Sequence, residues 1–117
     1  MNNVCLIGRL TKDVEVRYTQ TNNTMVASFT LAVNRRFAKE GEQQADFIPI
    51  VVWGKSAEFA SKYFKKGMQV SIVGRIQTRA WDDQNGQKRY ATEVVAEEVG
   101  FAEGRKNEAE QTNDLPF

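Results

Sequence analysis

Apolar and polar residues alternate with a period of two along most of this chain of 117 residues. A period of two places successive side chains on opposite faces of an extended segment, so the pattern is typical of half-buried β-strands. It predicts five strands, over residues 3–10 (continued after a kink over 14–19), 25–33, 47–53, 68–78 and 90–101. The alternation therefore constrains the chain to an all-β fold.

One segment, residues 56–66, departs from this alternation and predicts a helix. Phe59, Tyr63 and Phe64 recur in it at helical spacing and form an apolar stripe, so we expect all three in the core. Gly67 follows and suits the C-terminal cap of the helix, because glycine adopts a left-handed conformation readily.

Three strands, one helix and two strands follow one another in the order of an OB-fold, a five-stranded barrel. A small SH3-like barrel or another β-barrel with one helix fits less well, because the helix falls between the third and fourth strands. We expect one domain over residues 1–101, since a chain of this length is large enough for one core. Residues 102–113 are then a short flexible linker in an acidic tail, and residues 114–117 form its tip.

Single residues refine these strands. Gly8 interrupts the first strand, where we expect a bulge or a sharp bend. Pro49 predicts an edge position or a bulge, because proline cannot donate to a ladder. Asn85-Gly86 is a strong hairpin signal. Cys5 is the single cysteine, so it cannot form an internal disulfide, and we expect it to be a small buried hydrophobe.

The chain contains no histidine, which removes the usual general base, the serine–histidine and cysteine–histidine nucleophiles, and nearly every zinc site. Asp82 and Asp83 are adjacent acids, but they precede Asn85-Gly86 and are expected to be turn residues. We therefore expect no enzyme, no catalytic residue, and no cofactor or metal. The cysteine usage and the lack of a long apolar run predict a cytoplasmic protein without a membrane segment.

The net charge of +1 is divided unevenly along the chain. Residues 1–96 carry fourteen Lys and Arg against nine Asp and Glu, whereas residues 97–117 carry two against six. A basic body with an acidic end is typical of a polyanion-binding domain whose tail avoids the polyanion.

Aromatic residues outside the helix recur beside cations. The groups are Phe37 after Arg35-Arg36, Trp53 before Gly54-Lys55, Trp81 between Arg79 and the returning Lys88-Arg89, and Phe47 at the start of the third strand. Cations that follow phosphates and flat side chains that stack on bases are what a protein needs to bind single-stranded nucleic acid without reading its sequence. Each stacked base contributes about 1–3 kcal/mol in such proteins.

Some of the aromatic residues could belong either to the hydrophobic core or to a binding surface. Phe29 alternates with Leu31, so we expect it in the core. Trp53 ends an apolar run, and the pattern leaves core and binding surface open. Trp81 lies beside a turn, where burial is hard to arrange, and Phe37 lies in a charged loop, so both favour binding.

The last four residues, Asp114-Leu115-Pro116-Phe117, combine an acid, an aromatic ring and an α-carboxylate after a polar stretch. One interpretation is a frayed end with chance apolar residues. The other, which we favour, is a docking tip offered to a basic, apolar pocket of another protein.

A series of motifs runs through nearly the whole chain in a specific order. It comprises Asn3-Val4-Cys5-Leu6-Ile7-Gly8-Arg9-Leu10 with Asp13, Val16-Arg17-Tyr18, Ala27-Ser28-Phe29-Thr30-Leu31-Ala32-Val33, Val51-Val52-Trp53-Gly54-Lys55, Tyr63-Phe64-Lys65-Lys66-Gly67, Val73-Gly74-Arg75-Ile76-Gln77-Thr78-Arg79, Trp81, Tyr90 and Thr92-Glu93-Val94-Val95. With these motifs and its Asp-Leu-Pro-Phe end, the chain resembles the bacterial-type single-stranded DNA-binding proteins (SSB).

The resemblance implies an OB fold and a homotetramer, a dimer of dimers in which the first strand pairs across a two-fold axis. It also implies sequence-independent binding of single-stranded DNA that wraps over the assembly. By matching motif, the base-stacking positions are Phe37, Phe47, Trp53 and Trp81. The implied phosphate contacts are Arg35, Arg36, Lys55, Lys62, Arg75, Arg79, Lys88 and Arg89. The tip, Asp114, Leu115, Pro116 and Phe117, would recruit DNA replication, recombination and repair proteins in the nucleoid or at replication sites.

The chain departs from the family pattern in three respects. Two positions that are commonly tryptophan are Phe37 and Phe47 here, so we expect weaker stacking at both. The linker over residues 102–113 is short and reaches roughly 20 Å on average if flexible. Asn113 replaces one of the acids of the tip. A phage-, plasmid- or competence-type member and the sole SSB of a compact genome both fit these features.

Two other functions stay open at this point. One is an adaptor, an OB module that holds proteins together at a replication or restart site and has weak affinity for DNA. The other is an RNA-binding OB domain, which shares the stacking logic but needs contacts to 2′-hydroxyl groups.

Overall fold

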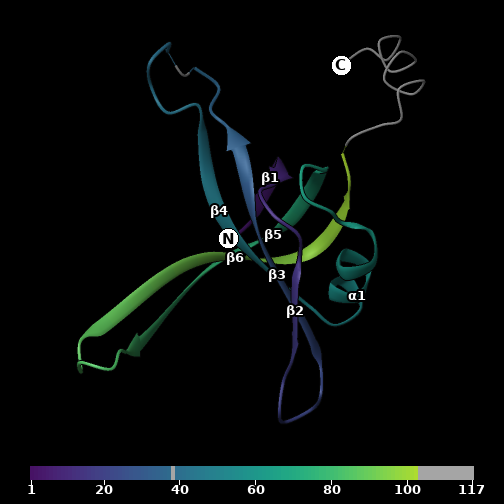
Figure 1. Cartoon of the computed structure of the whole chain (residues 1–117), viewed down its shortest axis with the longest axis vertical. Helices are drawn as coiled ribbons and strands as arrows, with labels where there is room; N and C mark the ends of the chain where they lie inside the picture. The colour runs from purple at the N-terminus through teal and green to yellow at the C-terminus, as the bar shows by residue number, and fades with distance from the viewer. Residues whose placement is uncertain (38, 103–117) are drawn as a thin grey trace.

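A computed structural model describes residues 1–37 and 39–102 of the chain (Figure 1). The described residues form β1 (Val4–Leu10), β2 (Glu15–Tyr18), β3 (Met25–Asn34), β4 (Ala45–Trp53), α1 (Gly54–Tyr63), β5 (Gln69–Asp82) and β6 (Lys88–Phe101). Every strand that the alternation predicts is present, and the helix lies between β4 and β5, where the sequence places it.

The strands close into a barrel. Their order is β1-β5-β6-β4-β3-β2, and β1 also pairs with β3 at Arg9 and Leu10, which completes the ring. β4 and β6 are parallel, and the other neighbours are antiparallel. β2 resumes the pairing with β3 where β1 leaves it, so the predicted continuation of the first strand after a kink is confirmed. The predicted all-β OB-fold is confirmed as well.

The core lies inside this barrel and beneath α1. Leu31 and Ile50 are fully buried, and Phe29 meets Phe64 edge to face with ring centroids 5.8 Å apart. Phe59 is partly buried against this cluster. The predicted core positions of Phe29 and Phe64 are therefore confirmed.

The C-terminal end of the helix differs from the prediction. α1 ends at Tyr63, and Phe64 is already extended and turns inward. Tyr63 packs beside neighbouring rings but keeps 50% of its surface exposed, so its predicted place in the core is wrong. Gly67 adopts a φ of 86° in the following turn, in which the N–H of Met68 donates to the carbonyl oxygen of Lys65, and not at the helix cap.

Pro49 lies in an interior strand, so the predicted edge position is wrong. β4 is flanked by β3 and β6, and the register through Thr30 and Pro49 is unbroken. Thr30 directs its carbonyl oxygen away from β4, to the N–H of Thr11 at 3.0 Å. The pairing of β4 with β6 begins only at Ile50. The ladder therefore requires no N–H at Pro49, which is why an interior strand tolerates it.

The predicted bulge at Gly8 and the predicted burial of Cys5 are also wrong. Gly8 pairs with Val70 in continuous register, and the register shift lies instead between Val73 and Gly74 of β5. Cys5 is exposed, because its side chain alternates with the inward Val4 and points to the outer face of the strand. The predicted alternation is present in β1, but an alternating pattern does not say which face of the strand meets the core.

Two hairpins extend beyond the barrel (Figure 1). The β5–β6 hairpin pairs continuously from the barrel to Asp82 and Lys88, and the β3–β4 hairpin pairs up to Asn34 and Ala45. The Asn85-Gly86 turn closes the first of them, with a φ of 79° at Gly86, as predicted. No helix within the described residues is long and apolar enough to cross a membrane.

Candidate nucleic-acid interface

The outer face of β4 carries a row of exposed side chains. Phe47 and Trp53 keep 61% and 47% of their surface exposed, while the alternating Ile50 and Val52 are fully buried. The two residues are six positions apart in the strand, which corresponds to roughly 20 Å. The sequence pattern did not decide whether Trp53 lies in the core or at the surface; the structure places it at the surface.

The β5–β6 hairpin presents the second tryptophan on one of its faces. Trp81 pairs with Arg89, and two residues along, Arg79 pairs with Ala91, so these side chains share a face. Trp81 is 41% exposed, and the guanidinium carbon of Arg79 lies 4.7 Å from the centroid of its ring. Nε of Arg79 in turn donates to Oε1 of Glu93 at 3.2 Å.

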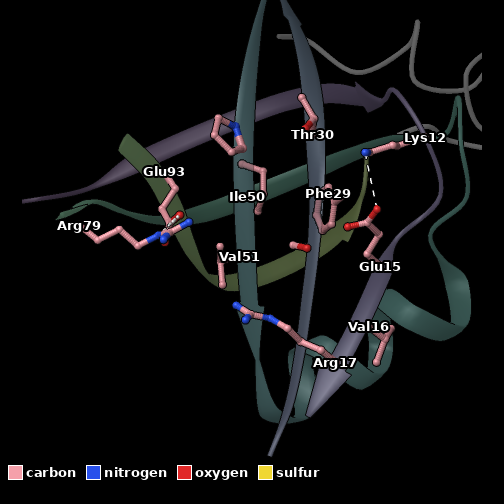
Figure 2. A pocket seen from close by; sticks show the side chains of 12 residues that line it. Lys12, Glu15, Val16, Arg17, Phe29, Thr30, Ile50, Val51, Arg79 and Glu93 are labelled. Carbon is pink, nitrogen blue, oxygen red and sulfur yellow. Dashed lines mark hydrogen bonds and ion pairs between the residues drawn. The ribbon is translucent and has the colours of Figure 1, made fainter. Parts of the chain in front are cut away.

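A groove of about 480 Å³ joins these two regions. Its lining comes from β2, β3, β4, β5 and β6 and the turn before β2, namely Lys12, Glu15, Val16, Arg17, Ser28, Phe29, Thr30, Pro49, Ile50, Val51, Arg79 and Glu93. Figure 2 shows the side chain of Arg17 extending from β2 toward Val51, with Arg79 and Glu93 together on the opposite side. A strand of nucleic acid laid along β4 would therefore cross a floor of small and apolar side chains with cations on both sides.

The β3–β4 loop offers Phe37, which is 88% exposed. The loop is fixed at its base, because Arg35 donates from Nε and Nη2 to Oδ1 of Asp46 at 3.0 and 2.8 Å. These hydrogen bonds and the charge of Asp46 raise the pKa of Arg35 above its ordinary value. The N–H of Arg35 also donates to the carbonyl oxygen of Gln44 at 2.8 Å. Phe37 is thus held out on an anchored loop, apart from the groove.

The tip of the β5–β6 hairpin is organised by Asp83. Its Oδ1 accepts from the N–H groups of Gln87 and Asn85, both at 2.9 Å, and its Oδ2 accepts from Nε of Arg89 at 2.8 Å. The bond from Gln87 is the largest cause that lowers the pKa of Asp83 below its ordinary value, followed by those from Arg89 and Asn85. Asp83 is therefore a turn residue, as the sequence predicted.

The eight predicted phosphate contacts divide into two groups. Four arginines form ion pairs with acidic side chains, namely Arg35 with Asp46 (2.8 Å), Arg75 with Glu97 (3.2 Å), Arg79 with Glu93 (3.2 Å) and Arg89 with Asp83 (2.8 Å). The other four, Arg36, Lys55, Lys62 and Lys88, form no ion pair with any residue that the structure describes. Lys88 pairs with Asp82, one step from the pair of Trp81 and Arg89, so it lies on the other face of the hairpin.

The structure thus brings Phe47, Trp53 and Trp81 to the surroundings of one groove and places Phe37 on a separate loop. The predicted tip over residues 114–117 lies outside the described residues. Sequence reasoning missed Arg17 and Glu93 as residues of the groove. Glu93 gave a signal that could have been used, since it is a single acid in an apolar stretch, whereas Arg17 becomes recognisable only from the register that sets β2 beside Trp53.

Comparison with known families decides the family of this barrel. The model of the single-strand binding protein family matches residues 1–102. This chain belongs to that family. The resemblance inferred from the motifs is confirmed, and the matched range covers the whole described barrel.

Bacterial relatives are similar in sequence over most or all of this chain. "Single-stranded DNA-binding protein 3" of Clostridium acetobutylicum is 59% identical over 115 residues, which are 97% of this chain and 80% of that protein. "Single-stranded DNA-binding protein 1" of Streptococcus pyogenes serotype M18 is 54% identical over 130 residues and covers 100% of this chain and 99% of its own length. "Single-stranded DNA-binding protein" of Clostridium tetani is 56% identical over 103 residues, 88% of this chain and 71% of that protein.

Proposed function

We propose that this protein binds single-stranded DNA without sequence preference, by stacking bases on exposed aromatic rings and by contacting phosphates with neighbouring cations. The observation that carries the proposal is the row of Phe47 and Trp53 on β4, beside a groove with cations on both sides that reaches Arg79, the arginine over the ring of Trp81. Flat exposed rings on a folded surface stack on any unpaired base, because every base has a face.

The geometry also favours unpaired over duplex nucleic acid. The rings stand apart along one face, so each can receive a separate base, whereas the bases of a duplex are already stacked on one another. Cations beside the rings would follow the phosphates and release counterions. Lys55, two residues after Trp53, and Arg36, next to Phe37, form no ion pair with a described residue, so both can contact phosphates without giving up an acidic partner.

The test is a fluorescence titration with oligo-dT, with duplex DNA and matched oligo-U as competitors. We expect quenching of Trp53 and Trp81, weak competition by duplex, and a loss of about 1–3 kcal/mol in binding free energy, about 5- to 150-fold in Kd, for Trp53→Ala. Tyr90→Ala is the matched control, because Tyr90 is exposed but pairs with Ala80 on the other face of the hairpin from Trp81. Equal affinity for duplex, or an equal loss for Tyr90→Ala, would refute the proposal, and preference for oligo-U would make the protein an RNA binder.

We further propose that the protein assembles as a homotetramer, a dimer of dimers in which β1 pairs across a two-fold axis to form each dimer. β5 covers one side of β1 from Val4 to Arg9, but β3 meets its other side only at Arg9 and Leu10. The remaining edge is open for a second copy, and such pairing removes an exposed edge. Light scattering should give a mass four times that of one chain, and the mass of a single chain would refute the assembly.

The last proposal concerns the tail. Residues 102–113 would act as a linker and Asp114, Leu115, Pro116 and Phe117 as a tip that recruits replication, recombination and repair proteins. The support is the sequence itself, in which an apolar pair follows a polar stretch. Deletion of residues 115–117 should abolish capture of partner proteins and leave DNA affinity unchanged or slightly higher. Loss of tetramers on this deletion would instead make the tip structural.

A further inference from the structure

Trp81 lies on the β5–β6 hairpin, which extends beyond the barrel (Figure 1), and 41% of its surface is exposed. Its neighbours on the same face are Arg79, Arg89 and Ala91, and the guanidinium of Arg79 lies over the ring at 4.7 Å from its centroid. A ring that must be ordered when a base arrives loses affinity to the cost of ordering. A ring that is already held before the base arrives avoids this cost.

Arg79 is itself held by Glu93, a residue that lines the groove. Its Nε donates to Oε1 of Glu93 at 3.2 Å, and Nε2 of Gln77 lies 3.5 Å from Oε2 of the same carboxylate. The side chain of Glu93 is only 8% exposed, whereas Asp46 and Glu97, the acids beside Arg35 and Arg75, are about half exposed. A carboxylate so deeply covered needs its cation, because a buried charge without a partner is costly.

The fourth acid, Asp83, is also largely covered but keeps two backbone N–H donors if Arg89 leaves it. If Arg79 leaves, Glu93 keeps only the longer contact from Nε2 of Gln77, at 3.5 Å, among the contacts that the structure describes. A phosphate that drew Arg79 away would therefore leave the covered carboxylate of Glu93 with that one long contact, and the phosphate would itself approach this negative charge. Of the four paired arginines, Arg79 is the least free to change partners.

Resting on the proposed binding of single-stranded DNA, we propose that Glu93 and Arg79 are positioning residues for Trp81. Glu93 fixes the guanidinium of Arg79, and the guanidinium supports one face of the indole, so that the other face is presented to a base. Arg79 then leaves the set of phosphate contacts that the family resemblance implied. Arg17, which lines the same groove and forms no ion pair with a described residue, takes the phosphate in its place.

The test uses Trp53→Phe as the parent, since the chain has two tryptophans and Trp81 is then the sole fluorophore of its kind. In the free protein, Arg79→Lys and Glu93→Gln should each lower the fluorescence anisotropy of Trp81 and increase its quenching by acrylamide. Arg79→Lys keeps the charge but not the flat guanidinium, so it separates support of the ring from attraction of phosphate. Arg17→Gln is the matched control and should leave both signals unchanged.

Salt dependence of oligo-dT binding gives the second readout. Each phosphate contact on a single strand contributes about 0.7 to the slope of log K against log salt. Arg17→Gln should reduce the slope by about that amount, whereas Arg79→Lys, Arg79→Gln and Glu93→Gln should weaken binding several-fold with the slope unchanged. The double change at Arg79 and Glu93 should be no worse than the single ones.

Two results would overturn the positioning role. One is a slope lowered by about 0.7 in Arg79→Gln, and the other is an unchanged Trp81 anisotropy in both Arg79→Lys and Glu93→Gln. If Glu93→Gln unfolds, Arg79→Lys alone decides, because Arg79 is half exposed. If the parent fails to bind oligo-dT, the proposed function fails, while the anisotropy of the free protein still decides whether Glu93 and Arg79 hold the ring.

Discussion

Replacing Gly8 by alanine would place a methyl group against the backbone of β3, where the barrel closes. An ideal Cβ at this position lies 2.6 Å from the carbonyl oxygen of Ala32 and 3.1 Å from Cγ2 of Val33. Ordinary contact begins at 3.4 Å, so β1 and β3 would have to separate by about 0.8 Å. The oxygen belongs to the backbone and cannot rotate away, and Arg9 and Leu10 next to it carry the pairing that completes the ring.

The expected cost follows from two opposing effects. Overpacking of a filled site destabilises by about 1–3 kcal/mol. Alanine also restricts the unfolded chain more than glycine, which offsets about 0.4–1 kcal/mol of that. A net loss of about 1–2 kcal/mol would lower the melting temperature by roughly 4–15 °C in a domain of this size.

The assay is thermal and urea denaturation followed by circular dichroism at one fixed protein concentration, because assembly stabilises the folded state by mass action. Gly100→Ala is the matched control. Its Cβ would lie 3.4 Å from Oγ of Ser71, an ordinary contact with a side chain that can rotate, so we expect no loss of stability and a gain of at most about 1 kcal/mol from the restricted unfolded chain. The reasoning is refuted if Gly8→Ala is no less stable than Gly100→Ala.

Three further outcomes are expected. Phe64→Ala should cost about 3–5 kcal/mol in urea denaturation, because the ring is buried among other aromatic rings, and a cost below about 1 kcal/mol would contradict this core. Phe47→Trp should tighten oligo-dT binding in a fluorescence-independent assay such as calorimetry, since a larger ring stacks more strongly, and weaker binding would show that Phe47 does not stack. Because the folded pKa of Asp83 is lowered, the hairpin tip keeps its stabilisation above the ordinary value of 3.8 and loses it as the pH falls through the lower folded value. Trp81 emission in the Trp53→Phe background should therefore respond only at acid pH, and a response near neutrality would point to another group.

The fold could be predicted from the sequence because its signals are local. Strand alternation, the 3.6-residue stripe of the helix and Asn85-Gly86 each depend on residues a few positions apart, and together they fix the order of elements. The errors arise where a local pattern does not say which other element covers a given face of a helix or strand. Tyr63 continues the apolar stripe of the helix but lies in its last turn. Cys5 is a residue type common in cores, but it occupies an outward-facing position of β1.

The candidate site was predictable in part for the same reason. Trp81 and Phe37 were expected at the surface from a turn and a charged loop, whereas the pattern did not decide for Trp53, and Phe47 was assigned by its matching motif. The structure places all four rings at the surface. The partners of the cations could not be found, because they lie across the sheet. Arg79 and Glu93 are 14 residues apart, and Arg75 and Glu97 are 22 apart, so only the register of β5 with β6 brings them together.

The long β5–β6 hairpin has a consequence for local stability. A two-stranded ribbon without a packed face is marginally stable in water, so the outer half of this hairpin should open far more often than the barrel. Backbone amides near Trp81 should exchange with solvent quickly in the free protein, while those near Ile72 on the same strand exchange only on global unfolding. A strand of DNA that stacks on Trp81 would close this opening, so binding should protect amides along the ribbon as well as those beneath the ligand.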